Sequence, residues 1–161
     1  MKVRYWIAAT FLAIGWFAYT HPPTRGSAPT LIAKTIAGQN IDLHAMKGKP
    51  ILVSFWATSC PACTRKIPDM AKLYKKYPRD QFEIIAVSMS YDQPDQVLRF
   101  IQEHQLPWPV VLDHDGSIAR SFGEVSLIPA NFLISPEGEV IQHDIGELDF
   151  QQTEKNIHAL L

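Results

Sequence analysis

The feature that most constrains this chain is a pair of cysteines placed where a buried strand gives way to a helix. Cys60-Pro61-Ala62-Cys63 directly follows an apolar run, residues 51–57, and holds both cysteines of the chain. The first turn of a helix presents free N–H groups and the positive end of the helix dipole. A cysteine there has a lowered pKa and is a nucleophile near neutral pH. A cysteine one turn further on can attack the mixed disulfide that the first one forms.

Three other uses of such a pair are possible. A structural disulfide would close only a short loop, which stabilises a chain by roughly 2 kcal/mol. A zinc site usually needs four ligands, but there is no second cysteine pair and the histidines are scattered singly. Haem attachment needs a histidine directly after the second cysteine, and Thr64 stands there. The first two uses are disfavoured and the third is excluded. We therefore expect redox chemistry with no metal and no cofactor beyond the cysteine pair.

Composition fits one globular domain with a short N-terminal attachment. The chain has 161 residues, of which 47% are hydrophobic and 19% charged, enough for a single core. Its formal net charge is −1. With no basic patch, no nucleic-acid partner is expected. No glycine-rich phosphate loop is present, so no nucleotide is expected either.

The N-terminus has the layout of an export signal. Lys2 and Arg4 precede residues 5–19, which are apolar and uncharged. This stretch is short beside the roughly 20 residues that span a bilayer, but it lacks a convincing cleavage site. Residues 1–20 are therefore predicted to be a signal peptide or, preferably, a retained signal anchor. Either alternative places the domain outside the cytoplasmic membrane, in the periplasm or an equivalent compartment, where disulfides persist.

The rest of the chain alternates strands and helices. Residues 21–30 are rich in proline and small polar residues, which predicts a linker. The expected elements of the 31–161 domain are a hairpin (31–36 and 41–43), a strand (51–57), a helix (60–77) kinked at Pro68, a strand (82–89), a helix (94–104), a strand (110–112), a helix (117–122), a second hairpin (131–134 and 140–141) and a helix (153–161). This order predicts an α/β fold with a central sheet flanked by helices.

The segment from Phe55 to Cys63, followed by Pro68 and later by Ile128-Pro129, resembles the active site of the thioredoxin fold. More narrowly, it resembles the membrane-anchored TlpA/ResA/DsbE (CcmG) group of thiol–disulfide oxidoreductases. The likeness covers roughly residues 29–161, including the N-terminal hairpin and a central insert, residues 91–122. It implies a thioredoxin-like domain with a mixed central sheet.

The resemblance also implies the roles of the site residues. Cys60 would attack a substrate disulfide and Cys63 would resolve the mixed disulfide. Pro129 would be cis and lie beside the cysteines. The implied substrate contacts are Trp56, Pro61, Ala62, Ile128 and Pro129. The backbone of Ile128 would then pair with an extended segment of the substrate, as in strand addition.

The implied activity is reduction of protein disulfides by an exported, monomeric, membrane-anchored enzyme. A transmembrane thiol electron donor would re-reduce the pair, and cytochrome c maturation or related thiol maintenance would be the setting. Alternatives are an oxidising or isomerising disulfide catalyst, a non-catalytic binding module and a peroxiredoxin-like thiol peroxidase. Peroxidases of that type carry a threonine three residues before the reactive cysteine, where this chain has Ala57.

Three positions depart from the family pattern. Lys66 replaces an acid that commonly follows the second cysteine, and Ser54 replaces the buried acid of thioredoxins. Such acids accept the proton of the resolving thiol. Without them, the sequence identifies no group that deprotonates Cys63. Lys66 either favours thiolates by its charge or is a solvated helix lysine. Ser59 replaces a tryptophan, which predicts a more open rim.

Outside the motif, Glu83, Glu124 and His114 are further polar candidates, but each is expected at the surface.

Overall fold

The computed structural model describes residues 26–161. The expected signal segment, residues 1–20, and the first half of the linker lie outside the described residues. The elements are β1 (Ile32–Lys34), β2 (Asn40–Asp42), β3 (Ile51–Trp56), α2 (Pro61–Lys76), β4 (Glu83–Ser88), α3 (Pro94–His104), β5 (Val110–Leu112), α4 (Ser117–Ser121), β6 (Ala130–Ile134), β7 (Val140–Ile145) and α5 (Phe150–Leu160).

The core of the fold is a five-stranded mixed sheet in the order β5-β4-β3-β6-β7. Strands β3, β4 and β5 are parallel, whereas β6 pairs antiparallel with β3 and β7 pairs antiparallel with β6. Every residue of β3, β4 and β6 is buried, as expected for strands covered on both faces. The sheet confirms the expected mixed α/β architecture.

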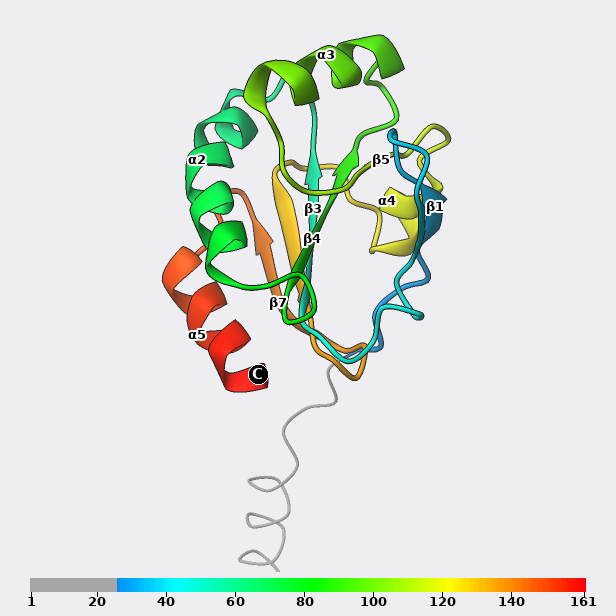
Figure 1. Ribbon diagram of the computed structural model, residues 1–161. Helices are drawn as coiled ribbons and strands as arrows, with labels where there is room; N and C mark the ends of the chain where they lie inside the picture. The colour runs from blue at the N-terminus through cyan, green and yellow to red at the C-terminus, as the bar shows by residue number, and fades with distance from the viewer. Residues whose placement is uncertain (1–25) are drawn as a thin grey trace, which may run out of the picture.

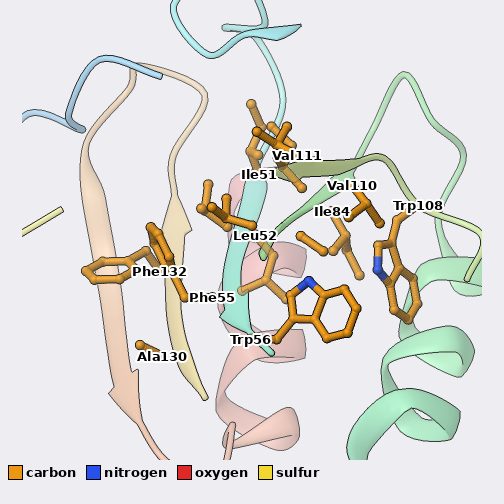
Figure 2. Packing of buried hydrophobic residues seen from close by; sticks show 14 of the residues in the cluster. Ile51, Leu52, Phe55, Trp56, Ile84, Trp108, Val110, Val111, Ala130 and Phe132 are labelled. Atoms are coloured by element: carbon orange, nitrogen blue, oxygen red, sulfur yellow. The ribbon is translucent and has the colours of Figure 1, made fainter. Parts of the chain in front are cut away.

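Helices cover the two faces of this sheet. Figure 1 shows α2 and α5 together on one side, and α4 with strand β1 on the other. Because successive residues of a strand point to opposite faces, Phe55 and Trp56 lie on different sides. Phe55 packs edge-on against Phe122 and Phe132, with ring centroids 5.2 and 5.8 Å away. Trp56 packs on Phe100 of α3 at 4.9 Å. Figure 2 shows Phe55 and Trp56 within the same buried cluster.

The central insert is part of the sheet rather than a separate lobe. It provides α3, the edge strand β5 and α4. The β1–β2 hairpin, predicted around a turn at Gly38, lies against the insert, because Thr35 forms an isolated bridge with Val111 of β5.

The structured domain begins earlier than the sequence indicated. The linker was expected to reach residue 30, but Ala28 is buried. Its N–H donates to the carbonyl oxygen of Gly138 at 2.8 Å, and Val140 N–H donates to Gly26 at 3.0 Å. Residues 26–28 therefore pair with the β6–β7 turn instead of acting as a tether.

Two element boundaries also differ. Strand β7 extends to Ile145 and α5 begins at Phe150, both beyond the range that the sequence predicted. Asp149 caps α5 by accepting from Gln152 N–H at 2.9 Å. The full length of β7 was missed because the alternation along it is weak, with mostly half-buried residues on both faces. The start of α5, which follows β7, was misplaced with it. Helix α2 continues through Pro68 to Lys76.

Candidate active site

Cys60 and Cys63 form a disulfide at the start of α2, with Cα atoms 5.3 Å apart. Cys60 is the N-cap residue, and its sulfur accepts a hydrogen bond from Cys63 N–H at 3.1 Å. Pro61 occupies the first helical position, where its missing N–H costs no hydrogen bond. The first turn contains no acidic residue. A thiolate at Cys60 would therefore be stabilised by the helix dipole and by the Cys63 N–H, and no carboxylate in that turn would repel it.

A carboxylate from the insert holds the loop that leads to Cys60. Asp92 accepts from Thr58 N–H at 2.8 Å, from Thr58 Oγ1 at 2.9 Å and from Ser88 Oγ at 3.0 Å. These bonds tie the end of β3 to the end of β4. Sequence reasoning missed Asp92 because it lies 34 residues from Thr58, and its only local sign is a turn-forming Asp before Pro94.

The Ile128–Pro129 peptide bond is cis, as the resemblance implied. Pro129 is buried and lines the same cavity as Cys63. The carbonyl oxygen of Pro129 accepts from Gly146 N–H at 2.7 Å, while no described residue hydrogen-bonds the backbone of Ile128. Leu127, next to it, is 65% exposed. The cis-proline is thus beside Cys63, and the backbone of Ile128 next to it is free.

The other expected substrate contacts divide into two groups. Pro61 is exposed and Ala62 is half-buried, so both remain available at the surface. Ser59 is exposed as well, which agrees with an open rim. Trp56 is only 6% exposed. It lines the cavity beside Cys63, because its place on β3 turns it toward α2 and α3, and its role as a substrate contact stays a prediction.

Lys66 is not a freely solvated lysine. Its side chain is 24% exposed, and its Nζ lies 3.5 Å from Glu147 Oε2 and 5.9 Å from the centre of the Phe150 ring. Lys66 also lines the cavity beneath Cys63. The Lys66 charge is therefore paired with Glu147, and its effect on thiolates of the cysteine pair stays a prediction.

Glu83 corrects an expectation from the sequence. It was placed at the surface, but it is 8% exposed. Its carboxylate accepts from Tyr74 Oη at 2.8 Å and lies 3.7 Å from Lys49 Nζ. Burial, and next the hydrogen bond to Glu83, raise the pKa of Tyr74 to about 12. Glu83 is at the opposite end of β4 from the cysteines, so it belongs to the structure of the domain. His114 and Glu124 are exposed, as expected.

Comparison with known proteins decides the family. Residues 25–143 match the AhpC/TSA family. Over 134 residues the chain is 36% identical to the thiol-disulfide oxidoreductase ResA of Bacillus thuringiensis subsp. konkukian, a match that covers 83% of this chain and 76% of ResA. The chain belongs to the AhpC/TSA family. Within it, this AhpC/TSA protein is a relative of the ResA thiol–disulfide oxidoreductases, as the motif resemblance indicated.

Solved structures give the fold of this AhpC/TSA protein. A thioredoxin-family thiol:disulfide interchange protein from Chlorobium tepidum has a TM-score of 0.76 and 25% identity, covering 85% of this chain and 99% of that one. StoA from Bacillus subtilis has a TM-score of 0.67 and 28% identity, covering 83% of this chain and 98% of that one. The fold is thioredoxin-like.

Within residues 26–161 no helix is both long enough and apolar enough to cross a membrane. Among the same residues, no three His, Cys, Asp or Glu side chains lie close enough together to bind a metal ion.

Proposed function

We propose that this AhpC/TSA protein reduces disulfide bonds of protein substrates outside the cytoplasmic membrane. The relatives that it matches and its Cys60–Cys63 pair make it a thiol–disulfide oxidoreductase. The observation that carries the proposal is the juxtaposition of this pair with Pro129, because a free backbone at Ile128 gives an extended chain a place to bind beside the cysteines.

The reaction follows from the positions of the two cysteines. The Cys60 thiolate attacks one sulfur of the substrate disulfide, and the other substrate sulfur leaves as a thiolate that takes up a proton. Cys63 then attacks Cys60, which releases the second substrate sulfur and forms the Cys60–Cys63 disulfide. Two electrons pass from the enzyme to the substrate. We propose no cofactor besides the pair.

The proposed cellular setting rests on the N-terminal sequence and on the family. Lys2 and Arg4 before an apolar stretch support a signal anchor. In an oxidising compartment the pair must be re-reduced, so we propose a transmembrane thiol electron donor. Cytochrome c maturation is the proposed pathway, by the resemblance to the TlpA/ResA/DsbE group, and the enzyme is proposed to act as a monomer.

Trapping of substrates tests the mechanism. Cys63→Ala leaves Cys60 able to attack but removes the group that resolves the mixed disulfide. We expect covalent complexes that disappear on reduction, seen on non-reducing gels and identified by mass spectrometry as joined through Cys60. Cys60→Ala is the matched control and should trap none. A folded Cys63→Ala protein that forms no complex would contradict the mechanism.

The direction of electron flow has its own measurement. Equilibration of the Cys60–Cys63 pair with glutathione or with a thioredoxin of known potential gives its reduction potential. We expect a value well below that of oxidising catalysts, whose potential is about −120 mV. A value near that of the oxidising catalysts would instead assign the protein to disulfide formation or isomerisation.

A thiol peroxidase is the second candidate, because the AhpC/TSA family match covers residues 25–143. Ala57 at the position of the peroxidase threonine counts against it. Consumption of hydrogen peroxide by the reduced protein separates the two functions. Turnover of peroxide much faster than reduction of a protein disulfide would favour the peroxidase.

A further inference from the structure

A small cavity lies directly beneath the cysteine pair, between the sheet and α2. Its volume is about 30 Å³, more than the roughly 10–15 Å³ that a cavity needs to hold a water molecule. The lining includes Ser54, Trp56, Cys63, Trp108, Pro129 and Asn131. Most of the wall is apolar, but Ser54, Asn131, Lys66 and the indole of Trp56 share this space with the resolving cysteine.

The first of these polar groups is an indole N–H without a partner. Trp56 Nε1 is fully buried and has no hydrogen-bond partner among the described residues. A buried donor left unpaired costs about 1–3 kcal/mol, so buried donors nearly always have a partner, which can be ordered water. Figure 2 shows the Trp56 nitrogen on the side of its ring nearest Ile84, the β4 partner of Leu52. Ser54 is the next residue along the same face of β3, because alternate residues share a face.

The second polar feature is the Ser54–Asn131 pair. These residues face each other on β3 and β6, and Ser54 Oγ donates to Asn131 Oδ1 at 2.8 Å. Both residues are buried. Since the Ser54 hydroxyl uses its proton in this bond, its oxygen is left as an acceptor, and the Asn131 amide still offers N–H donors. The cavity therefore offers donors and acceptors around a space large enough to hold water.

The cavity contains no carboxylate. Among the described residues that line it, Lys66 and the cysteine are the only ionisable groups. The proton of Cys63 must nevertheless leave when this thiol attacks the mixed disulfide. Neutral polar groups cannot keep that proton, but a water molecule held by them can pass it on.

We propose that this cavity binds one water molecule, held by Trp56 Nε1 and the Ser54–Asn131 pair, and that this water carries the proton of Cys63 during resolution. The inference rests on the proposed oxidoreductase function. The water takes the proton of Cys63 and passes one of its own outward. The Cys63–Cys60 bond forms, the bond from Cys60 to the substrate sulfur breaks, and that sulfur ends with the proton. Neither an internal acid nor an added oxidant is needed.

The water itself can be tested in the wild-type protein by NMR. The indole N–H of Trp56 should show a nuclear Overhauser effect to a long-lived water molecule. Absence of this signal in the folded, assigned protein would overturn the water site, whatever the enzyme proves to reduce.

The role of the water is tested with two variants of nearly equal volume. Ser54→Val removes the hydroxyl, whereas Ser54→Thr keeps it. After Cys60 has been joined to a small thiol, release of that thiol measures resolution by Cys63. We expect Ser54→Val to resolve at least about tenfold more slowly than Ser54→Thr, given the size of typical proton-transfer effects. Equal rates in the two variants, whether fast or slow, would overturn the role of the water.

Two further measurements keep this test separate from the proposed function. Attack of Cys60 on a disulfide, measured in the Cys63→Ala background, should be the same with Ser54, Val or Thr at this position. Loss of that attack in the wild-type background would contradict the oxidoreductase function itself. If Ser54→Val does not fold, Ser54→Ala removes the hydroxyl without adding volume, and it should also resolve more slowly than Ser54→Thr.

Discussion

Single residues position the reactive cysteine, and Asp92 is the one whose role is most open to test. Its carboxylate accepts three hydrogen bonds within 3.0 Å, two from Thr58 and one from Ser88. Thr58 is two residues from Cys60, so these bonds fix the loop from which α2 and its N-cap begin. A part-buried acceptor that satisfies a backbone N–H contributes both to stability and to the placement of Cys60.

Removing this carboxylate should weaken the domain and slow the first chemical step. Asp92→Ala leaves Thr58 N–H without its acceptor, so we expect the free energy of unfolding to fall by about 1–3 kcal/mol. Urea unfolding measures this loss, and the rate of Cys60 attack on a model disulfide reports the change in position. Asp92→Asn, which keeps one acceptor oxygen, should lie between wild type and alanine.

Asp95→Ala is the matched control for this loop. Asp95 forms an exposed ion pair with Arg99 at 2.9 Å, and such pairs contribute little to stability. Its removal should change the unfolding free energy by less than about 0.5 kcal/mol and leave the rate of attack unaltered. Equal effects at positions 92 and 95 would contradict the positioning role of Asp92.

At the scale of elements, helix α2 is attached to the sheet at both of its ends. Its first turn carries the cysteines, and near its last turn Tyr74 donates to Glu83 of β4 at 2.8 Å. Lys49 and Arg79 lie 3.7 and 3.9 Å from the same carboxylate. Glu83 is therefore a buried charge with donors and cations around it, which is the condition under which burial is tolerated.

The Tyr74–Glu83 contact predicts a loss of stability at high pH. Burial raises the pKa of Tyr74 to about 12 in the folded chain, whereas an unfolded tyrosine ionises near pH 10. The protonated form is thus favoured by folding, so its contribution is complete below about pH 10 and is lost as the pH rises toward 12. The free energy of unfolding should decrease over this interval.

Tyr74→Phe isolates this effect because phenylalanine has no proton to lose. Unfolding by urea at several pH values from 9 to 12 should give a shallower decrease for Tyr74→Phe than for wild type. Tyr77→Phe, at the C-cap of the same helix, leaves the contact with Glu83 intact and serves as the control. Parallel profiles for wild type and Tyr74→Phe would show that Tyr74 does not titrate in this way.

At the scale of the whole molecule, the two faces of the sheet have different tasks. On the α4 face, Phe55, Phe122 and Phe132 pack edge-on with ring centroids 5.1–5.8 Å apart, which forms an apolar core. On the α2 face, Ser54 and Trp56, which flank Phe55 along β3, line the cavity beneath Cys63. The alternation of a single strand therefore separates the stable core from the polar groups near the chemistry.

Much of the architecture could be predicted from the sequence because its signals are local. The buried run of β3, the cysteines at the start of α2 and the turn at Gly38 are read from neighbouring residues. The short edge elements were harder. The cap of α5 and the pairing of residues 26–28 were misplaced, since proline-rich or half-polar segments look like loops unless the partner strand is known.

The sequence by itself determined that this chain carries a redox pair at a helix start, because the spacing and the preceding strand are properties of contiguous residues. Only the tertiary structure decided what surrounds the pair. Asp92, Asn131, Pro129 and Glu147 come from distant parts of the chain, and sheet register and helix packing bring them near the cysteines. Burial and hydrogen bonding depend on such long-range contacts, so no local pattern reveals them.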